Sequence, residues 1–532
     1  APLSWLLQQR SGRAAGIIAA LLPAGLFTAL LTLLPVITAG SDLVERHSWV
    51  PSFGVTLTLR LDGLSLLFAL LVTGIGTLVT IYAGSYFRAA SVRRRTHFVL
   101  LIQLFMAAML GTGLADNLLV MYLFWEWTSL ISFLLIGFEA ARPEARKAAL
   151  QSLLMTVAGG LSMFAGILLL GRGLGTFSFT EILADPARFA ALDGAWVIAA
   201  LFLAGALTKS AQAPFHFWLP RAMEAPTPAS AYLHSATMVK LGIFLLARLD
   251  QPFSQLPGYG TVLITFGLAT MLMASLNTLR ERQYKALLAH STVASLGMLV
   301  FLLGLPGSGA RTAMLAFLLG HALYKATLFF AAGSVIAHAG TGELSRLTGL
   351  RRALPLTAAA ALLAGISMAG LPPLFGFIAK EAMLENVLGL AAGPARSFGL
   401  AGLVLASVVL VAVAWLSGVK PFRGAGGNEG SGETGGLAAG PLILGSAGLL
   451  FALFSDFFVT PLLQAAARTV TGEPLQLQLA LWHGPTPALA WSALVIVLGA
   501  ALIAAWPRLQ ALLPGPAAHL APTSEGGYEA VF

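Results

Sequence analysis

The sequence contains no cysteine and few charged residues. Of its 532 residues only 10% are charged, whereas 57% are hydrophobic. The lack of cysteine excludes disulfides, thiolate metal sites and iron–sulfur clusters made by this chain alone. The scarcity of charge excludes a soluble globular protein, because such a surface needs far more charged side chains. The sequence also lacks a Walker A, HExxH or GxSxG motif, so we expect no cofactor, no metal site and no enzyme activity.

Long apolar segments recur along the whole chain, and the mean hydropathy is +0.84. Segments of about 20 apolar residues are long enough to cross the hydrocarbon core of a bilayer as helices. We therefore expect an all-α polytopic membrane protein with about 14 transmembrane helices. The predicted spans are 17–39, 64–87, 98–113, 117–138, 147–171, 195–219, 228–249, 259–279, 286–305, 311–337, 353–377, 397–418, 438–460 and 488–507. Residues 1–9 resemble half of one further span.

The net charge of +9 does not indicate nucleic-acid binding, because the basic residues are scattered over short loops. Of the 31 lysines and arginines, 19 fall on the side of Arg10 and Arg13, among them Lys285. Eight fall on the opposite side, among them Arg248 and Arg311. The positive-inside rule places the larger group in the cytoplasm, and we expect a bacterial inner-membrane location.

Four basic residues fall inside the predicted spans, and all four are lysines: Lys209, Lys240, Lys325 and Lys380. The chain has only seven lysines, and its more numerous arginines are absent from these positions. Lysine can lose its proton when it is removed from water, whereas arginine effectively cannot. The presence of lysine and the absence of arginine inside the predicted spans indicate buried amines that change protonation state.

Two predicted spans contain helix-breaking residues. Span 195–219 contains Pro214, and span 353–377 contains Pro372 and Pro373. Broken helices at matching places in two halves of a transporter predict inverted repeats with a transport path at each break. We expect the following units: N-terminal spans in 1–97, a first inverted repeat in 98–249, a second in 259–418, a Gly-rich cytoplasmic loop in 419–437, and C-terminal spans with a polar tail in 438–532.

Glu126 lies in the otherwise apolar segment LFWEWTS, where an unpaired carboxylate is costly. A structural ion pair that locks two helices would explain it. The functional alternative is that Lys209 is its partner and that each group changes the proton affinity of the other. For Lys209 itself, the structural alternative is a lysine that caps carbonyls freed at the broken helix.

Further titratable residues accompany the other buried lysines. His234 precedes Lys240 by six residues, within two helical turns, and His321 and Lys325 are four residues apart on one helical face. Lys380 follows the second break and is a candidate terminal proton site, unless it snorkels to the interface. Weaker candidates lie beside Lys380 or near span ends: Glu381, His216 and Asp116.

These segments resemble the antiporter-like subunits shared by respiratory complex I and the Mrp cation/proton antiporters. The similarity covers residues 55–420, and it is most specific in TKSAQAPFHFWLPRAMEAPTPASAYLHSATMVKLG at 208–242 and SMAGLPPLFGFIAKEAML at 367–384. Within that superfamily, the sequence is most similar to the large A subunit of Mrp antiporters. The resemblance implies two inverted repeats, Glu126 and Lys209 as a coupled pair, the central histidines and lysines as relay residues, and Lys380 as the exit.

The resemblance also implies partner subunits in a membrane hetero-oligomer that exchanges cytoplasmic sodium for external protons. Subunits of this A type normally continue into another membrane-embedded region, whereas this sequence stops at GGYEAVF and begins without methionine. We therefore expect a truncated chain or a short relative. Two alternatives are a proton-pumping membrane-arm subunit of a redox-driven complex and a non-conducting assembly scaffold.

Overall fold

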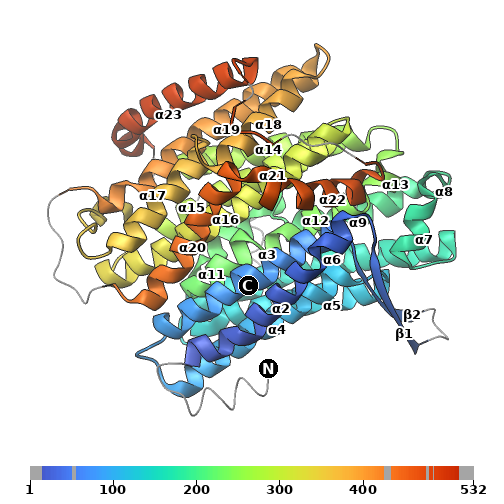
Figure 1. Cartoon of the computed structure of the whole chain (residues 1–532), viewed down its shortest axis with the longest axis horizontal. Coiled ribbons are helices and arrows are strands. Elements are labelled where there is room, and N and C mark those ends of the chain that lie inside the picture. Colours follow the sequence, from blue (N-terminus) through green and yellow to red (C-terminus); the bar gives the residue numbers. More distant parts are fainter. Residues whose placement is uncertain (1–14, 51–54, 425–432, 475–478, 483, 514–532) are drawn as a thin grey trace.

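A computed structural model describes residues 15–50, 55–424, 433–474, 479–482 and 484–513. The expected half-span at 1–9, most of the Gly-rich loop and the polar tail from 514 lie outside the described residues. The described part is a bundle of helices (Figure 1). Twelve helical segments of this part are long and apolar enough to cross a membrane, and one of them, Thr227–Arg248, consists of two shorter helices. The predicted polytopic helical fold is therefore confirmed.

The helices fall into an N-terminal part up to Ser254 and a C-terminal part from Tyr259. The N-terminal part contains α2 (Ala15–Thr38), α3 (Gly63–Tyr86), α4 (Val92–Leu114), α5 (Leu118–Ile136), α6 (Pro143–Leu174), α7 (Phe179–Ala184), α8 (Pro186–Ala190), α9 (Ala195–Lys209), α10 (Trp218–Arg221), α11 (Thr227–Ser235), α12 (Leu241–Arg248) and α13 (Asp250–Ser254). The C-terminal part contains α14 (Tyr259–Arg280), α15 (Tyr284–Gly304), α16 (Ser308–Ala339), α17 (Pro355–Ala369), α18 (Phe375–Leu388), α19 (Pro394–Gly418), α20 (Gly435–Leu453), α21 (Ser455–Phe458), α22 (Thr460–Thr471) and α23 (Pro487–Leu512).

The two predicted spans with prolines are shorter than expected. Helix α9 ends at Lys209 and α17 ends at Ala369, so neither is among the twelve long spans, and 14 full spans are not confirmed. Proline lacks an N–H group and cannot continue the ladder of helix hydrogen bonds. Gly370, with φ of +69°, ends α17 in the left-handed conformation that glycine adopts most readily. The breaks thus occur where the prolines predict them.

A third break interrupts the predicted span 228–249. Helix α11 ends at Ser235, and α12 begins at Leu241 after a 3₁₀ turn over Met238–Lys240. Neither proline nor glycine lies at this break. Instead, the Thr237 hydroxyl donates to the Tyr232 carbonyl at 2.7 Å, and the Lys240 amine donates to the Ser235 carbonyl. Polar side chains therefore satisfy carbonyls that the broken helix leaves without a backbone partner.

A β-hairpin departs from the all-α expectation. Strand β1 (Leu43–Val50) pairs antiparallel with β2 (Val55–Leu61), with Leu43 opposite Leu61 and an irregularity between Ser48 and Val50. The hairpin projects from one end of the bundle (Figure 1). The alternation of apolar and polar residues in VTLTLRL has the period of a strand, so the sequence does contain a signal for β2.

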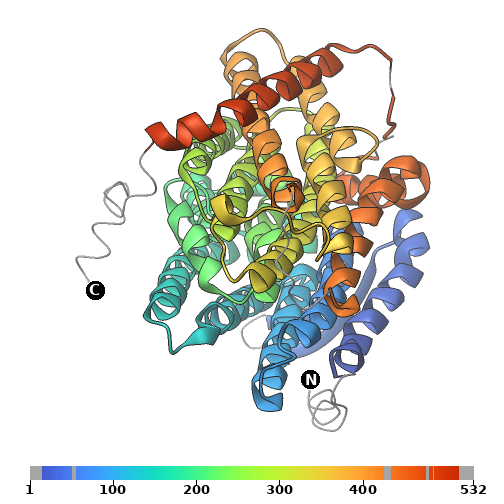
Figure 2. The ribbon, with the colours of Figure 1, turned by 90° about the vertical axis from the view of Figure 1, so that its left-hand side faces the viewer.

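The most buried helices lie in the middle of the molecule. In the most apolar 18-residue stretch of α16, and in that of the α11–α12 segment, all residues are buried. In the corresponding stretches of α2 and α23, only 17% and 22% of the residues are buried. Figure 2 shows α23 crossing the outside of the bundle. Titratable residues on α16 and α11–α12 are therefore shielded from lipid and from bulk water by the surrounding helices.

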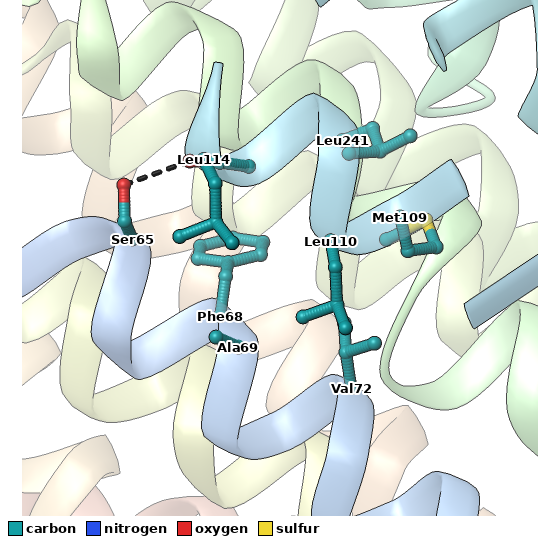
Figure 3. Close-up of a pocket in the computed structure, with 9 residues that line it drawn as sticks. Ser65, Phe68, Ala69, Val72, Met109, Leu110, Leu114 and Leu241 are labelled. Carbon is teal, nitrogen blue, oxygen red and sulfur yellow. Dashed lines mark hydrogen bonds between the residues drawn. The ribbon is translucent and has the colours of Figure 1, made fainter. Parts of the chain in front are cut away.

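One small cavity lies between α3, α4 and α12 (Figure 3). It is lined mainly by apolar side chains, with Phe68, Leu110 and Leu241 among them. Its single polar side chain, Ser65, donates a hydrogen bond to the Gly113 carbonyl at 2.7 Å. No titratable side chain lines this cavity, so it offers no group for proton transfer.

Candidate functional site

The first pair of candidate residues lies between α5 and α9. Lys209 is completely buried, and its amine donates to the Ser129 hydroxyl at 2.8 Å and to the Trp125 carbonyl at 3.3 Å. The same amine lies 5.2 Å from the centre of the Trp125 ring, within the range of a cation–π contact. Lys209 is therefore held by α5 and does not cap the carbonyls at its own break.

Glu126 lies on α5, one turn from Ser129. Its Oε1 atom is buried and has no hydrogen-bond partner within the described part of the chain. Glu126 and Lys209 interact electrostatically, but the described residues show no ion pair between them within 4 Å. The structure thus brings the predicted pair together as neighbours that are not in direct contact.

Two glycines on α6 make room for this pair. A Cβ atom at Gly160 would overlap Glu126 Oε1, and a Cβ atom at Gly159 would overlap the Thr208 hydroxyl. No side chain larger than hydrogen fits at either position without a shift of α5 or α9. The sequence analysis did not identify these glycines, and the adjacent pair in TVAGGLS is the signal that could have done so.

The middle of the site combines residues from α11–α12 and α16. The amine of Lys325 donates to the Ser291 hydroxyl and to the Leu288 carbonyl on α15, the second at 3.2 Å. His321 interacts electrostatically with both Lys240 and Lys325. The structure therefore brings His321, Lys240 and Lys325 together, although they come from two different segments.

His234 and His321 have no hydrogen-bond partner on either ring nitrogen among the described residues. Both imidazoles are completely buried. His234 lies at the end of α11, and the break described above separates it from Lys240. The expectation that His234 and Lys240 share one continuous helix was therefore wrong. A buried polar group without a partner is rare and needs an explanation, for which bound water is one candidate.

Lys380 lies at the second break. Its side chain is only 5% exposed, and its amine donates to the Ala369 carbonyl at 3.2 Å. This contact is the capping of a freed carbonyl, the structural alternative that we considered for Lys209. A Cβ atom at Gly370 would lie 2.6 Å from Lys380 Cε, so the glycine is needed for this approach. The burial of Lys380 is inconsistent with snorkelling to an interface.

The three weaker candidates differ in their surroundings. Glu381 is buried on α18 and accepts a hydrogen bond from Ser492 on α23. His216 lies in a buried 3₁₀ turn, Phe215–Phe217, just after Pro214. Asp116 accepts hydrogen bonds from the hydroxyls of Ser178 and Thr180, both at 2.8 Å, and lies 3.9 Å from the Arg60 guanidinium. Asp116 therefore anchors a loop at the end of the bundle.

Two buried ion pairs were missed by the sequence analysis, which placed Arg248 and Arg311 in external loops. Arg248 pairs with Asp62, and Arg311 donates to Asp250 at 2.9 Å. Both arginines are less than a tenth exposed. The motif Arg-Leu-Asp occurs at 60–62 and again at 248–250. This repeat is the signal that could have indicated acidic partners for these arginines.

Asp62 caps the N-terminus of α3, outside the spanning part of the helix. Burial alone would raise the pKa of this carboxyl. The charge of Arg248, hydrogen bonds from Arg248 and from the Ser65 backbone, and the charge of Arg60 together outweigh burial and lower the pKa of Asp62 below its usual range. Asp62 therefore stays ionised and ties α3 to the end of α12.

Lys285 also differs from its predicted place in a cytoplasmic loop. It lies in the first turn of α15, where its amine donates to the carbonyls of Met223 and Ala225, both at 2.6 Å. His290, which the sequence analysis did not single out, lies 3.8 Å from Glu281 through its Nε2 atom. These residues add titratable groups on α15, where Lys285 contacts the segment that follows the first break.

Comparisons with known proteins identify the family of the chain. Residues 115–406, more than half of the chain, match the family described as NADH:quinone oxidoreductase/Mrp antiporter, TM. Residues 49–96 match the family described as NADH-Ubiquinone oxidoreductase (complex I), chain 5 N-terminus. The seven principal candidate residues, from Glu126 to Lys380, all lie within the first of these two segments.

Curated relatives include the A-type Na⁺/H⁺ antiporter subunit of Alkalihalophilus pseudofirmus, which is 38% identical over 87% of this chain and 61% of its own length. The A1-type Na⁺/H⁺ antiporter subunit of Staphylococcus haemolyticus is 34% identical over 91% of this chain and 63% of its own length. Their names describe transporter subunits, as expected from the sequence, and not enzymes. The chain thus spans about three fifths of the length of these relatives.

Solved structures show the same fold. A chain of the Mrp complex from Dietzia sp. DQ12-45-1b has a TM-score of 0.88 and 36% identity, and the match covers 100% of this chain and 57% of that one. A chain of an archaeal membrane-bound sulfane sulfur reductase has a TM-score of 0.74 at 19% identity, over 92% of this chain and 96% of that one. The second similarity concerns the fold alone. The protein is a multi-pass protein of the bacterial cell membrane, and it belongs to the NADH:quinone oxidoreductase/Mrp antiporter family, within which it resembles the A-type subunits of Na⁺/H⁺ antiporters.

Proposed function

We propose that this chain is the proton-translocating part of a cation/proton antiporter complex. In this proposal, protons move through a buried relay made of Glu126, Lys209, His234, Lys240, His321, Lys325 and Lys380. The complex exchanges cytoplasmic sodium for external protons, and this chain works in a hetero-oligomer with other membrane subunits. The names of the curated relatives support sodium and proton as the exchanged ions.

One observation carries the proposal. The amines of Lys209, Lys240, Lys325 and Lys380 are all buried, and their hydrogen bonds go to hydroxyl and carbonyl oxygens. Among the described residues, none of the four forms an ion pair with a carboxylate within 4 Å. Neutral oxygens can accept hydrogen bonds from an ammonium group. Loss of the proton from the amine costs less free energy beside neutral oxygens than beside a paired carboxylate. Such amines are suited to gain and lose protons.

The order of elements in the two halves supports a repeated half-path. In 98–249, three long helices precede a helix that ends at Lys209, where the first break begins. In 259–418, three long helices again precede a short helix, α17, and Lys380 lies just beyond its break. A lysine beside each broken helix agrees with a path that crosses from one repeat to the other.

A sodium/proton antiporter is favoured over a redox-driven pump by the degree of similarity. The antiporter subunits are 34–38% identical to this chain, whereas the sulfane sulfur reductase chain shares the fold at 19% identity. A redox-driven membrane subunit would use the same buried amines, so the distinction lies in the partners that drive the relay.

Lys209→Ala tests the relay directly. We expect this substitution to abolish sodium-dependent proton movement in everted vesicles that carry the whole complex, because the neighbouring Glu126 loses its exchange partner. Assembly is checked by the yield of the purified complex. If the assembled Lys209→Ala complex exchanged ions at the normal rate, the chain would act as a scaffold and the relay would be refuted.

A further inference from the structure

Helix α23 runs along the outside of the bundle, where it packs against α14, α18 and α19 (Figures 1 and 2). Most of its apolar surface is exposed, and Val497 on this surface is 64% exposed. Five residues of α23 are buried, namely Ala488, Ser492, Val495, Gly499 and Trp506. Ser492 is 4% exposed, and its hydroxyl donates to Glu381 Oε1. The packed face of α23 therefore directs a buried hydroxyl to a buried carboxylate on α18.

A small cavity lies beside Glu381, between α18 and the segment that precedes α23. Its lining includes Glu381 and Glu385 from α18, and Trp482, Thr486 and Leu489 from the other side. The cavity measures about 10 Å³, room for about one water molecule. Glu381 is buried, whereas Glu385, one helical turn further along, is exposed. The cavity therefore joins a buried carboxylate to one at the surface.

A second cavity of about 10 Å³ lies on another face of α18, toward the interior. Lys380 lines this inner cavity together with Tyr324, Ser367 and Ser407. Consecutive residues of a helix point about 100° apart, so Lys380 and Glu381 face different cavities from adjacent positions. Helix α18 thus separates the inner cavity from the outer one, with an amine on one side and a carboxylate on the other.

The outer cavity lies near the C-terminal end of α18 and the start of α23, since its lining includes Glu385, Thr486 and Leu489. The charge bias of the loops assigns this end of the bundle to the outside. External water therefore has a short way to Glu381 past Glu385.

We propose that Glu381 and Glu385 form the external inlet of the relay, and that Ser492 is a positioning residue that holds Glu381 in this inlet. A proton from external water binds the Glu385 carboxylate and passes through water to Glu381, where an O–H bond forms. This O–H bond then breaks as an N–H bond forms at the neutral Lys380 amine, so that both carboxylates return to their starting states. The inlet rests on the proposed function, since it requires the relay to carry the proton onward from Lys380.

The first test compares substitutions in the whole complex in everted vesicles. Ser492→Ala removes the donor to Glu381 and lowers the rate of sodium-dependent proton movement about tenfold, which corresponds to one hydrogen bond to a charged group. Ser492→Thr keeps the hydroxyl and restores most of the rate. Val497→Ala, on the lipid-facing side of the same helix, leaves the rate unchanged.

Glu385→Gln provides a variant that does not disturb the buried packing, because Glu385 is exposed. It lowers the rate severalfold, whereas Glu473→Gln makes the same charge change at another exposed external position and has no effect. If Ser492→Ala and Glu385→Gln both keep the normal rate while Lys209→Ala abolishes exchange, the inlet is refuted and the relay stands. If Lys209→Ala also keeps the normal rate, the proposed function itself fails.

The lack of cysteine in the chain allows a second test that does not depend on activity. Glu385→Cys, at the exposed position, is treated with a membrane-impermeant thiol reagent applied to one side of vesicles that carry the whole complex. The inlet predicts that this cysteine reacts from the external side. Reaction from the cytoplasmic side alone, or no reaction at all, would overturn the inlet.

Discussion

At Glu126, the buried Oε1 atom of a half-buried carboxylate is accommodated because the facing helix has no side chain at that level. Gly160 leaves the space that the Glu126 carboxylate occupies, and Gly159 does the same for Thr208. The absence of two side chains on α6 thus sets the distance between α5, α6 and α9. The position of the carboxylate relative to Lys209 depends on this spacing.

Gly160→Ala should therefore displace Glu126. We expect the rate of sodium-dependent proton movement to fall roughly 10- to 100-fold, because a small displacement of a reacting group has effects of this size. Gly25→Ala is the matched control, since a Cβ atom there would meet nothing within 4 Å. An unchanged rate in an assembled Gly160→Ala complex would show that the position of Glu126 is not important for exchange.

The ion pair between Asp62 and Arg248 predicts a pH-dependent stability. The lowered pKa of Asp62 means that the pair stabilises the folded state above the usual pKa of a carboxyl group. This contribution is lost as the pH falls through the lowered value. Arg248→Ala should destabilise the protein by about 3–5 kcal/mol at neutral pH, because it leaves a buried carboxylate without its partner.

Thermal unfolding of the purified complex at several pH values measures this effect. The difference between wild type and Arg248→Ala should be largest at neutral pH and should shrink at acidic pH, where Asp62 is protonated. Arg46→Ala, which removes an exposed arginine in β1, should have little effect at any pH. A difference that grows with acidity would contradict the assignment of the stabilising charge to Asp62.

At the scale of the elements, the three breaks have two different causes. The breaks after Lys209 and Ala369 are predicted by proline and glycine, which impose their own backbone geometry. The break between α11 and α12 is not predicted by the sequence, because Ala236 and Thr237 are compatible with a helix. There the hydrogen bonds of Thr237 and Lys240 compensate the interrupted backbone, and such compensation depends on tertiary structure.

Thr237→Val tests this account of the third break. The substitution keeps the shape of the side chain but removes the donor to the Tyr232 carbonyl, which is buried. We expect a loss of about 1–2 kcal/mol in stability, the cost of one buried hydrogen bond. Thr261→Val, which removes the hydroxyl of an exposed threonine on α14, serves as the comparison in thermal unfolding. Equal stability of the two variants would mean that Thr237 does not support the break.

The sequence predicted the helical fold and the burial of the four lysines, because hydropathy and the preference for lysine over arginine are properties of local sequence. It did not predict which helix holds each amine. Ser129 and Ser291, which accept from Lys209 and Lys325, are far from them in sequence and belong to common residue types. The ion pairs of Arg248 and Arg311 were missed for the same reason, since loop arginines are usually exposed.

At the scale of the whole molecule, the buried amines lie in the helices that are most shielded, and the exposed helices surround them. Lys325 lies on α16, and Lys240 lies between α11 and α12. Every residue in the most apolar stretch of each of these two segments is buried. Lys209 and Lys380 lie at the two proline breaks, where α9 and α17 end. The fold thus places the four amines in its most shielded segments and at its two proline breaks.

The central claim is that these four amines change protonation during transport. Replacing each in turn with arginine keeps the positive charge but removes the ability to release a proton. Sodium-dependent proton movement is measured in vesicles that carry the assembled complex, with Lys147→Arg, at an exposed position, as the control. The account predicts that each of the four arginine variants loses exchange and that Lys147→Arg keeps it. Normal exchange in the assembled arginine variants would contradict the account.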